Sequence, residues 1–209
     1  MKTLSHLLAL FLAFNIGLVS AQENDLPEFS LAISSGIGNS TIDNKRDYDY
    51  SLFCTNGELL LTYRFHNNWG IASGIGYTTL SGNAFNSIGH FYQYRDLIRI
   101  PLLVTLIYEN ESKYKLIAGA GLYGYNILNA QYRFGYDIAM LDVEGWNYGF
   151  QGELTFAFEI DEKFNIGINY KQMMDLGMLD VKLDNGKSLE SEQRIFDIIT
   201  LGLVASVKL

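Results

Sequence analysis

The stretch GELLLTYRFHNNWGIASGIGY, residues 57–77, contains two runs of alternating side chains that are separated by a short polar turn. Leu59 and Leu61 lie on one face of the first run, and Ile71 and Ile75 lie on one face of the second. Successive side chains of a strand point to opposite faces, whereas an amphipathic helix repeats every 3.6 residues. Two strands joined by so short a turn must run antiparallel. The stretch therefore predicts a β-hairpin in which each strand has one apolar face.

The same two-residue period recurs along the chain, and a helical period is not sustained anywhere in it. We count eight such runs, each close to the roughly ten residues with which a tilted strand crosses a membrane. The apolar residues that open them are Phe29, Leu59, Trp69, Ile98, Tyr114, Leu154, Phe164 and Ile199. An even number of antiparallel strands is typical of a closed transmembrane barrel.

The connections between the runs alternate between long and short. The long, polar or mixed segments are residues 39–56, 81–92, 127–146 and 176–193, and the short turns are residues 66–68, 108–112 and 161–163. Long loops on one side and short turns on the other are typical of an outer-membrane barrel, whereas a soluble barrel turns its apolar face inward. The sequence therefore predicts an all-β fold, an eight-stranded antiparallel up-and-down transmembrane β-barrel with short periplasmic turns and four long extracellular loops.

The polar faces of the runs carry charged side chains that are too costly to place against lipid. They are Glu58, Arg64, Arg95, Arg99, Lys115, Glu153, Glu159 and Lys171. A cation on the lipid face at mid-depth costs about 2–4 kcal/mol, so these groups are expected to point into the lumen and pair there. The interior of an eight-stranded barrel is just wide enough for side chains to fill it. We therefore predict a lumen charge network without an open channel, in which neighbouring glycines leave room for long side chains.

Aromatic residues gather near the ends of the predicted strands, where the two membrane surfaces would lie. They are Phe29, Trp69, Tyr77, Tyr114, Tyr132, Trp146, Phe164 and Tyr170. Such residues form girdles at both interfaces of outer-membrane barrels. Pro101 lies inside a predicted strand and removes a ladder donor, so it predicts a bulge or a local kink.

The first 21 residues, MKTLSHLLALFLAFNIGLVSA, have the three parts of a secretory signal peptide. Lys2 supplies the positive start, an apolar run follows, and small residues precede the expected cleavage after Ala21. The apolar run is shorter than the roughly 20 residues that a spanning helix needs. We therefore expect a signal peptide over residues 1–21, a barrel domain over residues 22–209, and export to the outer membrane of a Gram-negative bacterium.

The segment YRDLIRIPLLV, residues 94–104, resembles the "YLxIPLLL" strand of the PorT-like outer-membrane β-barrel family, which is also labelled the porin family. Glycine-rich runs at residues 70–77 and 118–123 stand in the order that this family shows, so the resemblance covers about residues 27–209. The resemblance implies the barrel fold, and it suggests an accessory role in protein secretion as one function. Two positions differ from the family, because Arg99 stands where Glu is more common and Leu209 ends the chain where an aromatic residue is usual.

Residues that could carry catalysis are few and scattered. The histidines His6, His66 and His90 lie far apart in the sequence, so no zinc site is expected. Ser87 lies in the same loop as His90, and Asp96 is the one nearby carboxylate that could orient such a pair. A solvated loop is the favoured interpretation, and a serine hydrolase is the weaker one.

The predicted loops contain three other features. Asp43, Asp47 and Asp49 do not have the spacing of a calcium-binding loop, so a solvated acidic loop is favoured over a Ca²⁺ site or an adhesive tip. The segment 127–146 is apolar enough to extend the strands, cover the barrel mouth or form a partner surface. Cys54 has no second cysteine to pair with, so it is an incidental free thiol or the site of an intermolecular disulfide.

The sequence indicates a non-enzymatic outer-membrane barrel with a structural or surface-interaction role, and it assigns no catalytic residue, cofactor or metal. Expected contacts are outer-membrane lipid and lipopolysaccharide, and an extracellular or envelope protein at the long loops. The net charge of −8 leaves no basic patch for nucleic acid. Three alternatives remain open, namely a small-solute porin, a lipid-A-modifying barrel enzyme and an accessory component of protein secretion.

Overall fold

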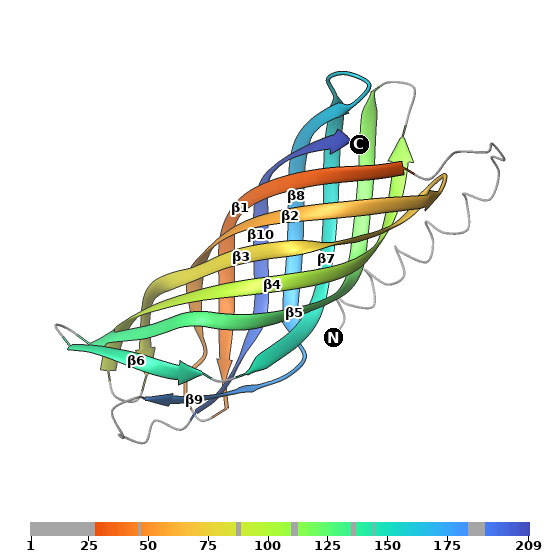
Figure 1. Cartoon of the computed structure of the whole chain (residues 1–209). Helices are drawn as coiled ribbons and strands as arrows, with labels where there is room; N and C mark the ends of the chain where they lie inside the picture. The colour runs from red at the N-terminus through yellow and green to blue at the C-terminus, as the bar shows by residue number, and fades with distance from the viewer. Residues whose placement is uncertain are drawn as a thin grey trace, which may run out of the picture.

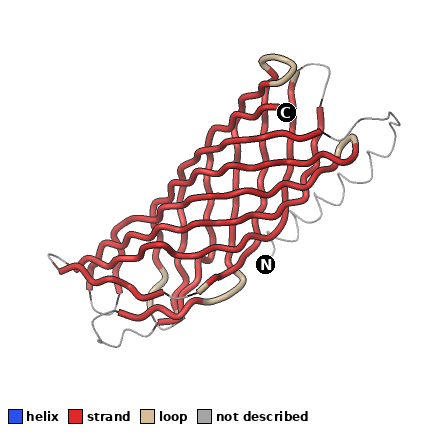
Figure 2. Tube along the Cα trace, viewed as in Figure 1, coloured by secondary structure: helices blue, strands red, loops and turns tan. Residues whose placement is uncertain are grey.

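The computed structural model describes residues 28–45, 47–86, 89–109, 113–134, 137–143, 145–183 and 191–209, which form one antiparallel sheet (Figures 1 and 2). Its long strands are β1 (Glu28–Asn44), β2 (Tyr50–His66), β3 (Trp69–Asn86), β4 (Gly89–Glu109), β5 (Tyr114–Phe134), β7 (Trp146–Glu159), β8 (Phe164–Asp175) and β10 (Ser191–Lys208). Two short strands are β6 (Asp137–Val143) and β9 (Leu179–Leu183). Among these residues, no helix is long and apolar enough to cross a membrane. The predicted signal peptide lies outside the described residues.

The long strands of the described chain close into a ring of eight. Each one pairs with its neighbours in the order β1, β2, β3, β4, β5, β7, β8, β10, and every pairing is antiparallel. The ring closes between β1 and β10, whose ladder runs from Ser30 opposite Lys208 to Asn44 opposite Gln193. The predicted eight-stranded antiparallel barrel is therefore confirmed.

The two ends of the barrel differ in construction. The end that carries the short turns and the residues Glu28 and Leu209 is called the base here, and the opposite end, with β6 and β9, is called the rim (Figure 1). At the rim β5 pairs with β6, β6 with β9, and β9 with β10. These two short strands continue the wall beyond the ends of β7 and β8. The strands consequently run further than predicted into the segments expected to be long loops, because their backbone groups keep ladder partners there.

The strands carry an exposed apolar outer face and a buried inner face that holds both polar and apolar side chains. On the outside Leu102 is 60% exposed and Leu203 is 70% exposed, and such residues continue around the ring as an apolar band. Six of the predicted girdle residues, Phe29, Tyr77, Tyr114, Trp146, Phe164 and Tyr170, are exposed. Trp69 is half-buried beside a turn. Tyr132 contradicts the girdle prediction, because β5 continues past the band and places this side chain in the lumen, 1% exposed.

Two local features adjust the ladders. Pro101 interrupts the pairing of β3 with β4, which passes from Ser73 opposite Leu102 to Gly76 opposite Arg99 without a change of register. The Ser73 hydroxyl donates to the Pro101 carbonyl oxygen over 2.8 Å. A bulge or a local kink was predicted at Pro101, whereas the ladder of β4 with β5 has its register shift earlier in the strand, between Asp96 and Leu97. Pro101 thus opens a gap in one ladder, because it lacks a backbone donor.

The turn between β7 and β8 is stabilised by a side chain. The Asp161 carboxylate accepts hydrogen bonds from the backbone N–H groups of Lys163 and Phe164, both at 2.8 Å. These two bonds hold the pKa of the Asp161 carboxyl below its usual range. The two bonds therefore fix the turn geometry from which β8 begins. Asp side chains commonly stabilise tight turns in this way.

Candidate functional site: the filled lumen

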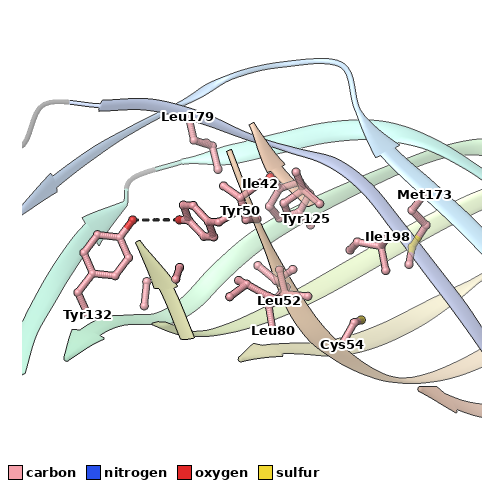
Figure 3. Close-up of a cluster of buried hydrophobic side chains, with 14 of the residues drawn as sticks. Ile42, Tyr50, Leu52, Cys54, Leu80, Tyr125, Tyr132, Met173, Leu179 and Ile198 are labelled. Atoms are coloured by element: carbon pink, nitrogen blue, oxygen red, sulfur yellow. Dashed lines mark hydrogen bonds between the residues drawn. The ribbon is translucent and has the colours of Figure 1, made fainter. Parts of the chain in front are cut away.

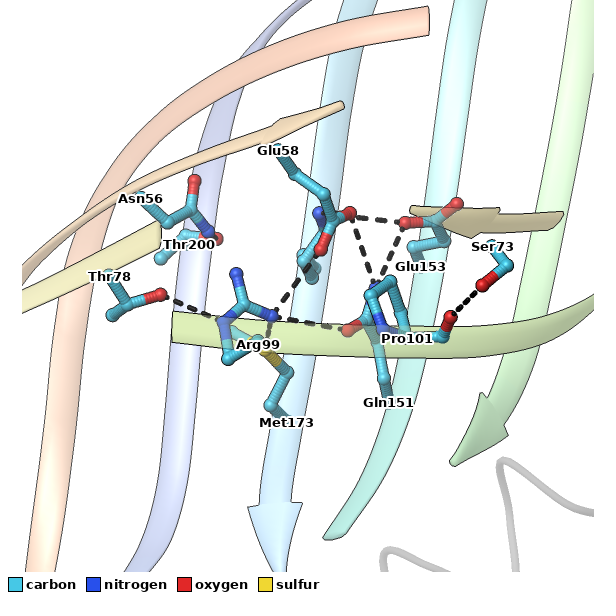
Figure 4. Close-up of polar contacts among 11 residues, drawn as sticks. Asn56, Glu58, Ser73, Thr78, Arg99, Pro101, Gln151, Glu153, Met173 and Thr200 are labelled. Atoms are coloured by element: carbon cyan, nitrogen blue, oxygen red, sulfur yellow. Dashed lines mark hydrogen bonds and ion pairs between the residues drawn. The ribbon is translucent and has the colours of Figure 1, made fainter. Parts of the chain in front are cut away.

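The middle of the lumen holds a charged cluster, defined as Glu58, Arg99, Glu153 and Lys171. Arg99 Nη1 lies 3.4 Å from Glu58 Oε2 (Figure 4). Lys171 Nζ contacts Glu58 Oε1 and lies 3.7 Å from Glu153 Oε2. None of these side chains is more than 6% exposed. Two cations face two carboxylates, so the buried charges balance, which is the condition under which charge is tolerated inside a protein.

Strand register explains why these side chains meet. Glu58 of β2 pairs with Gly76 of β3, and Gly76 pairs with Arg99 of β4, so a glycine separates the two charges. A Cβ on Gly76 would lie 3.0 Å from Arg99 Nη2 and 3.2 Å from Glu58 Oε2. Gly119 of β5 pairs with Glu153 of β7, and a Cβ there would lie 2.9 Å from Glu153 Cγ. These two glycines leave the room that the charged side chains need.

Other lumen-facing glycines have a different role from the one expected. A Cβ on Gly74, Gly121, Gly167 or Gly202 would lie between 1.9 and 2.2 Å from a carbonyl oxygen of the adjacent strand. No side chain could be accommodated at such a distance. These glycines therefore permit close approach of neighbouring strand backbones, a use of glycine that is common in tightly curved sheets.

Neutral side chains connect the charged cluster to the wall. Gln151 Nε2 donates to Glu58 Oε1 and to Glu153 Oε2 over 3.4 Å, and its Oε1 accepts from Arg99 Nη1 over 3.2 Å. Arg99 Nε also donates to Thr78 Oγ1 over 2.9 Å. Each charge thus has several partners, which reduces the penalty for removing it from water.

Three further residues of the predicted network, Arg64, Lys115 and Glu159, lie at the base. Arg64 Nη1 lies 3.1 Å from Glu109 Oε1, and Lys115 Nζ lies 3.4 Å from the same oxygen and 3.2 Å from Glu159 Oε2. Glu109 was not among the predicted residues. Continuing the two-residue period of β4 by one more step would have placed it on the lumen face.

Arg95, the last residue of the predicted network, lies nearer the rim and has neutral partners. It is 1% exposed and its Nη2 contacts Gln193 Oε1. Gln193 Nε2 donates to the Tyr132 hydroxyl over 3.0 Å, and that hydroxyl lies 3.2 Å from the hydroxyl of Tyr50. The ion pairs among the described residues do not include Arg95. The structure therefore brings four predicted residues together at mid-barrel and three at the base, and leaves Arg95 separate.

Asp175, a lumen residue that the sequence analysis missed, accepts four hydrogen bonds. Its Oδ1 accepts from the Tyr123 hydroxyl over 2.7 Å, and its Oδ2 accepts from the Tyr125 hydroxyl over 2.5 Å. Oδ2 also accepts from Asn147 Nδ2 over 3.3 Å and from the backbone N–H of Ile195 over 2.9 Å. Asp175 is 4% exposed. The period that places Lys171 inside continues to Asp175, which lies directly before the segment 176–193 predicted as a loop.

An apolar cluster fills the lumen toward the rim (Figure 3). Its fully buried aliphatic and sulfur-containing members are Ile42, Leu52, Cys54, Leu80, Leu97, Met173, Ile195 and Ile198. The sequence predicted a packed ionic and hydrogen-bonded lumen and did not predict this apolar cluster. It forms because the strands continue past their predicted ends and turn apolar side chains inward, beside the hydrogen-bonded Arg95 and Asp175. Cys54 belongs to β2 and not to a loop, and its complete burial removes it from any intermolecular disulfide.

Burial of the large central side chains shows that the described part of the lumen is closed. Arg95, Arg99, Tyr125, Tyr132 and Lys171 are each less than 2% exposed. A water-filled channel would expose the groups that line it, as in the large porins. The charged cluster and the apolar cluster thus occlude the barrel at two successive levels.

Metal-ligating side chains do not gather in the described part of the chain. It contains no group of three or more His, Cys, Asp or Glu side chains arranged to hold a metal ion. Asp43 and Asp49 of the first predicted loop have separate partners, since Asp43 Oδ2 pairs with Arg194 Nη2 over 2.7 Å and Asp49 Oδ1 accepts from the Asn44 N–H over 2.9 Å. Ser87, the nucleophile considered for a hydrolase, lies outside the described residues.

Comparisons with known proteins identify a fold and not a family. Neither the protein-family models nor the curated proteins include a match to this chain. A major outer membrane protein from Thermus thermophilus is 11% identical with a TM-score of 0.60, covering 88% of this chain and 100% of that chain. Neisserial surface protein A is 14% identical with a TM-score of 0.52, again over 88% and 100%. The outer membrane protease OmpT from Escherichia coli is 7% identical with a TM-score of 0.53, over 90% and 100%.

Proposed function

We propose that this protein is a non-enzymatic barrel of the bacterial outer membrane that transports no solute and acts through its outer wall and rim. The observation that carries the proposal is the occluded lumen. Arg99 and Lys171, each 1% exposed, hold its centre closed with Glu58. A barrel whose interior is filled by paired charges and apolar side chains offers its partners only its surface.

Location in the outer membrane is supported by three independent features. The outer face carries a continuous apolar band that only lipid would solvate without penalty. The N-terminal sequence has the pattern of a signal peptide. The fold is also that of outer-membrane barrels such as Neisserial surface protein A. In this location the base faces the periplasm and the rim faces the exterior.

Liposome swelling tests the proposal against the small-solute porin. Vesicles that contain the refolded mature protein are diluted into isotonic solutions of sugars of increasing size, and swelling is followed by light scattering. The proposal predicts the rate of protein-free vesicles for every sugar. Faster swelling with the smallest sugars would contradict it. Refolding is checked in the same samples from the different gel mobility of unheated and boiled protein.

The enzymatic and secretion alternatives need separate tests. OmpT shows that a similar fold also carries a protease, so the enzymatic alternative is tested directly. Mass spectrometry of lipid A from cells with and without the protein is expected to give identical acyl chains.

An accessory role in secretion rests on the PorT-like segment 94–104 and predicts co-purification with a secretion complex. We expect the protein to purify without one.

A further inference from the structure

A groove on the outer wall near the rim is not part of the lumen. Tyr92 and Tyr94 of β4 line it together with Gln131 and Arg133 of β5, and its volume is about 490 Å³. In the ladder Tyr92 pairs with Arg133 and Tyr94 pairs with Gln131. The four side chains share the outer face, because the residues that alternate with them on β4 are buried in the lumen.

Polar residues of β3 extend this groove on one side. Ser81 pairs with Tyr94, and Asn83 pairs with Tyr92. Asn83 is exposed and Ser81 is half-buried. The rings of Tyr92 and Tyr94 therefore lie between the carboxamide of Asn83 on one strand and that of Gln131 on another. The Ser81 hydroxyl and the Arg133 guanidinium complete the set. We call these six residues the β3–β5 groove.

The chemistry of the β3–β5 groove fits a phosphorylated sugar. Aromatic rings such as Tyr92 and Tyr94 offer flat apolar faces for the C–H side of a sugar ring, and carboxamides both donate to and accept from sugar hydroxyls. A guanidinium binds phosphate through two parallel hydrogen bonds. Arg133 is exposed, and among the residues whose side chains the structure describes it has no ion-pair partner.

The position of the groove identifies the source of that sugar. Along the outer face of β4, the side chains from Val104 through Leu102 to Ile100 form part of the apolar band and are about half exposed. Tyr94 lies eight residues from Leu102, which is near the middle of the apolar band, or about 26 Å of strand at 3.3 Å per residue, reduced to about 19 Å of height by the usual tilt. Half of the hydrocarbon core is about 15 Å thick, and about 20 Å with its headgroups, so Tyr94 lies above the core and near the outer edge of a phospholipid headgroup layer. A longer, sugar-containing headgroup reaches it.

We propose that the β3–β5 groove binds the phosphorylated oligosaccharide headgroup of an outer-leaflet glycolipid of the lipopolysaccharide type. The inference rests on the outer-membrane location proposed above. Arg133 contacts a phosphate group, the two tyrosine rings pack against sugar rings, and Gln131 and Asn83 bind their hydroxyls. Because the groove lies on one side of the barrel, this binding fixes the depth and the rotation of the protein in the outer leaflet.

Binding is tested with the refolded mature protein in zwitterionic detergent micelles. Native mass spectrometry measures its apparent affinity for purified lipopolysaccharide, for the same material after phosphatase treatment, and for phosphatidylglycerol. R133Q is expected to weaken lipopolysaccharide binding about tenfold, because a charge-assisted hydrogen bond is lost. It also removes the preference for the phosphorylated form. Y94A is expected to weaken binding of both forms, because it removes a stacking face.

The control is K163Q, which deletes an exposed cation from the turn at the base and is expected to bind like the wild type. Equal affinities of wild type and R133Q would overturn the proposal, and so would phosphatidylglycerol binding as tightly as lipopolysaccharide. A lipid-free phosphorylated core oligosaccharide is expected to bind more weakly than intact lipopolysaccharide. Equal binding would assign the groove to a soluble glycan instead. Liposome swelling is independent of all these outcomes, so loss of the groove proposal leaves the closed-barrel proposal standing.

Discussion

Arg99 of β4 and Glu58 of β2 form an ion pair across Gly76, the glycine that separates them in the register of three adjacent strands. The pair is completely buried and shares Glu58 with Lys171 of β8. Strands from two sides of the barrel are therefore tied together through one carboxylate.

Gly76→Ala is expected to destabilise the barrel by about 1–3 kcal/mol, because overpacking forces side chains or backbone to shift. Its Cβ would lie 3.0 Å from Arg99 Nη2. Urea unfolding in detergent, followed by tryptophan fluorescence, measures the change. Gly152→Ala is the matched control, since no atom lies within 4 Å of a Cβ there. Equal stabilities of the two variants would show that Gly76 does not hold the ion pair in place.

Glu58→Gln is expected to cost about 3–5 kcal/mol of unfolding free energy, because it leaves two buried cations with one fewer counter-charge. Lys171→Met carries a similar cost, and the double variant is expected to lose less than the sum. A double-mutant cycle on urea unfolding measures this coupling. The exposed pair Lys45–Glu192, with side chains 57% and 32% exposed, serves as the reference and is expected to couple by at most about 1 kcal/mol. Strict additivity for Glu58 and Lys171 would contradict their direct contact.

Tyr125→Phe is expected to loosen the lumen near the rim, because it removes the 2.5 Å hydrogen bond to Asp175 Oδ2. Loss of one partner from a buried acceptor costs about 1–3 kcal/mol. Cys54 is the single cysteine of the chain and belongs to the same apolar cluster, so maleimide labelling of its thiol reports local opening. Faster labelling than in the wild type is expected. Tyr170→Phe, on the exposed outer face, is the control and leaves the labelling rate unchanged.

Leu102→Arg is expected to destabilise the protein in lipid vesicles by about 2–4 kcal/mol, the cost of a cation on the lipid face at mid-depth. Leu102 is 60% exposed within the apolar band. Ser51→Arg introduces the same charge on an exposed site of β2 near the rim and is expected to have little effect. The two variants are compared by urea unfolding from phosphatidylcholine vesicles. A similar small effect for both would place the band in water and favour a soluble barrel.

Sequence alone predicted the ring because alternation is a local property of each strand. Within a few residues of Leu59, Ile71 or Ile100 the alternation already shows which face of each strand is apolar. A meander of such antiparallel strands has few arrangements that keep its polar groups away from lipid. The ends of the strands were not predictable in this way. Beyond the membrane-length segment the pattern inverts, since Leu52 and Leu80 turn inward while polar residues face outward. The polar composition of these segments resembles that of loops.

The sequence predicted which charged residues lie in the lumen, but not which of them contact one another. The alternation of side chains along each strand places Arg99 and Glu58 inside the barrel. Their contact depends on the strand register that puts a glycine between them, and only the assembled sheet defines that register. Asp175 and Ile195 meet across β8 and β10 near the rim, where the strands had been expected to end. Arg95 points inward and forms no ion pair with a carboxylate in the described part of the chain, so its neighbours could not be assigned by matching opposite charges.

Single-channel recording in planar lipid bilayers tests the occluded lumen most directly. The refolded mature protein is inserted at low density, and current is recorded across a range of voltages in concentrated potassium chloride. Wild-type protein is expected to give no stable current steps, because Arg99, Lys171 and Tyr125 block the barrel at successive levels. Reproducible steps that scale with the number of inserted molecules would contradict the account, and would mean that ions pass through an open lumen.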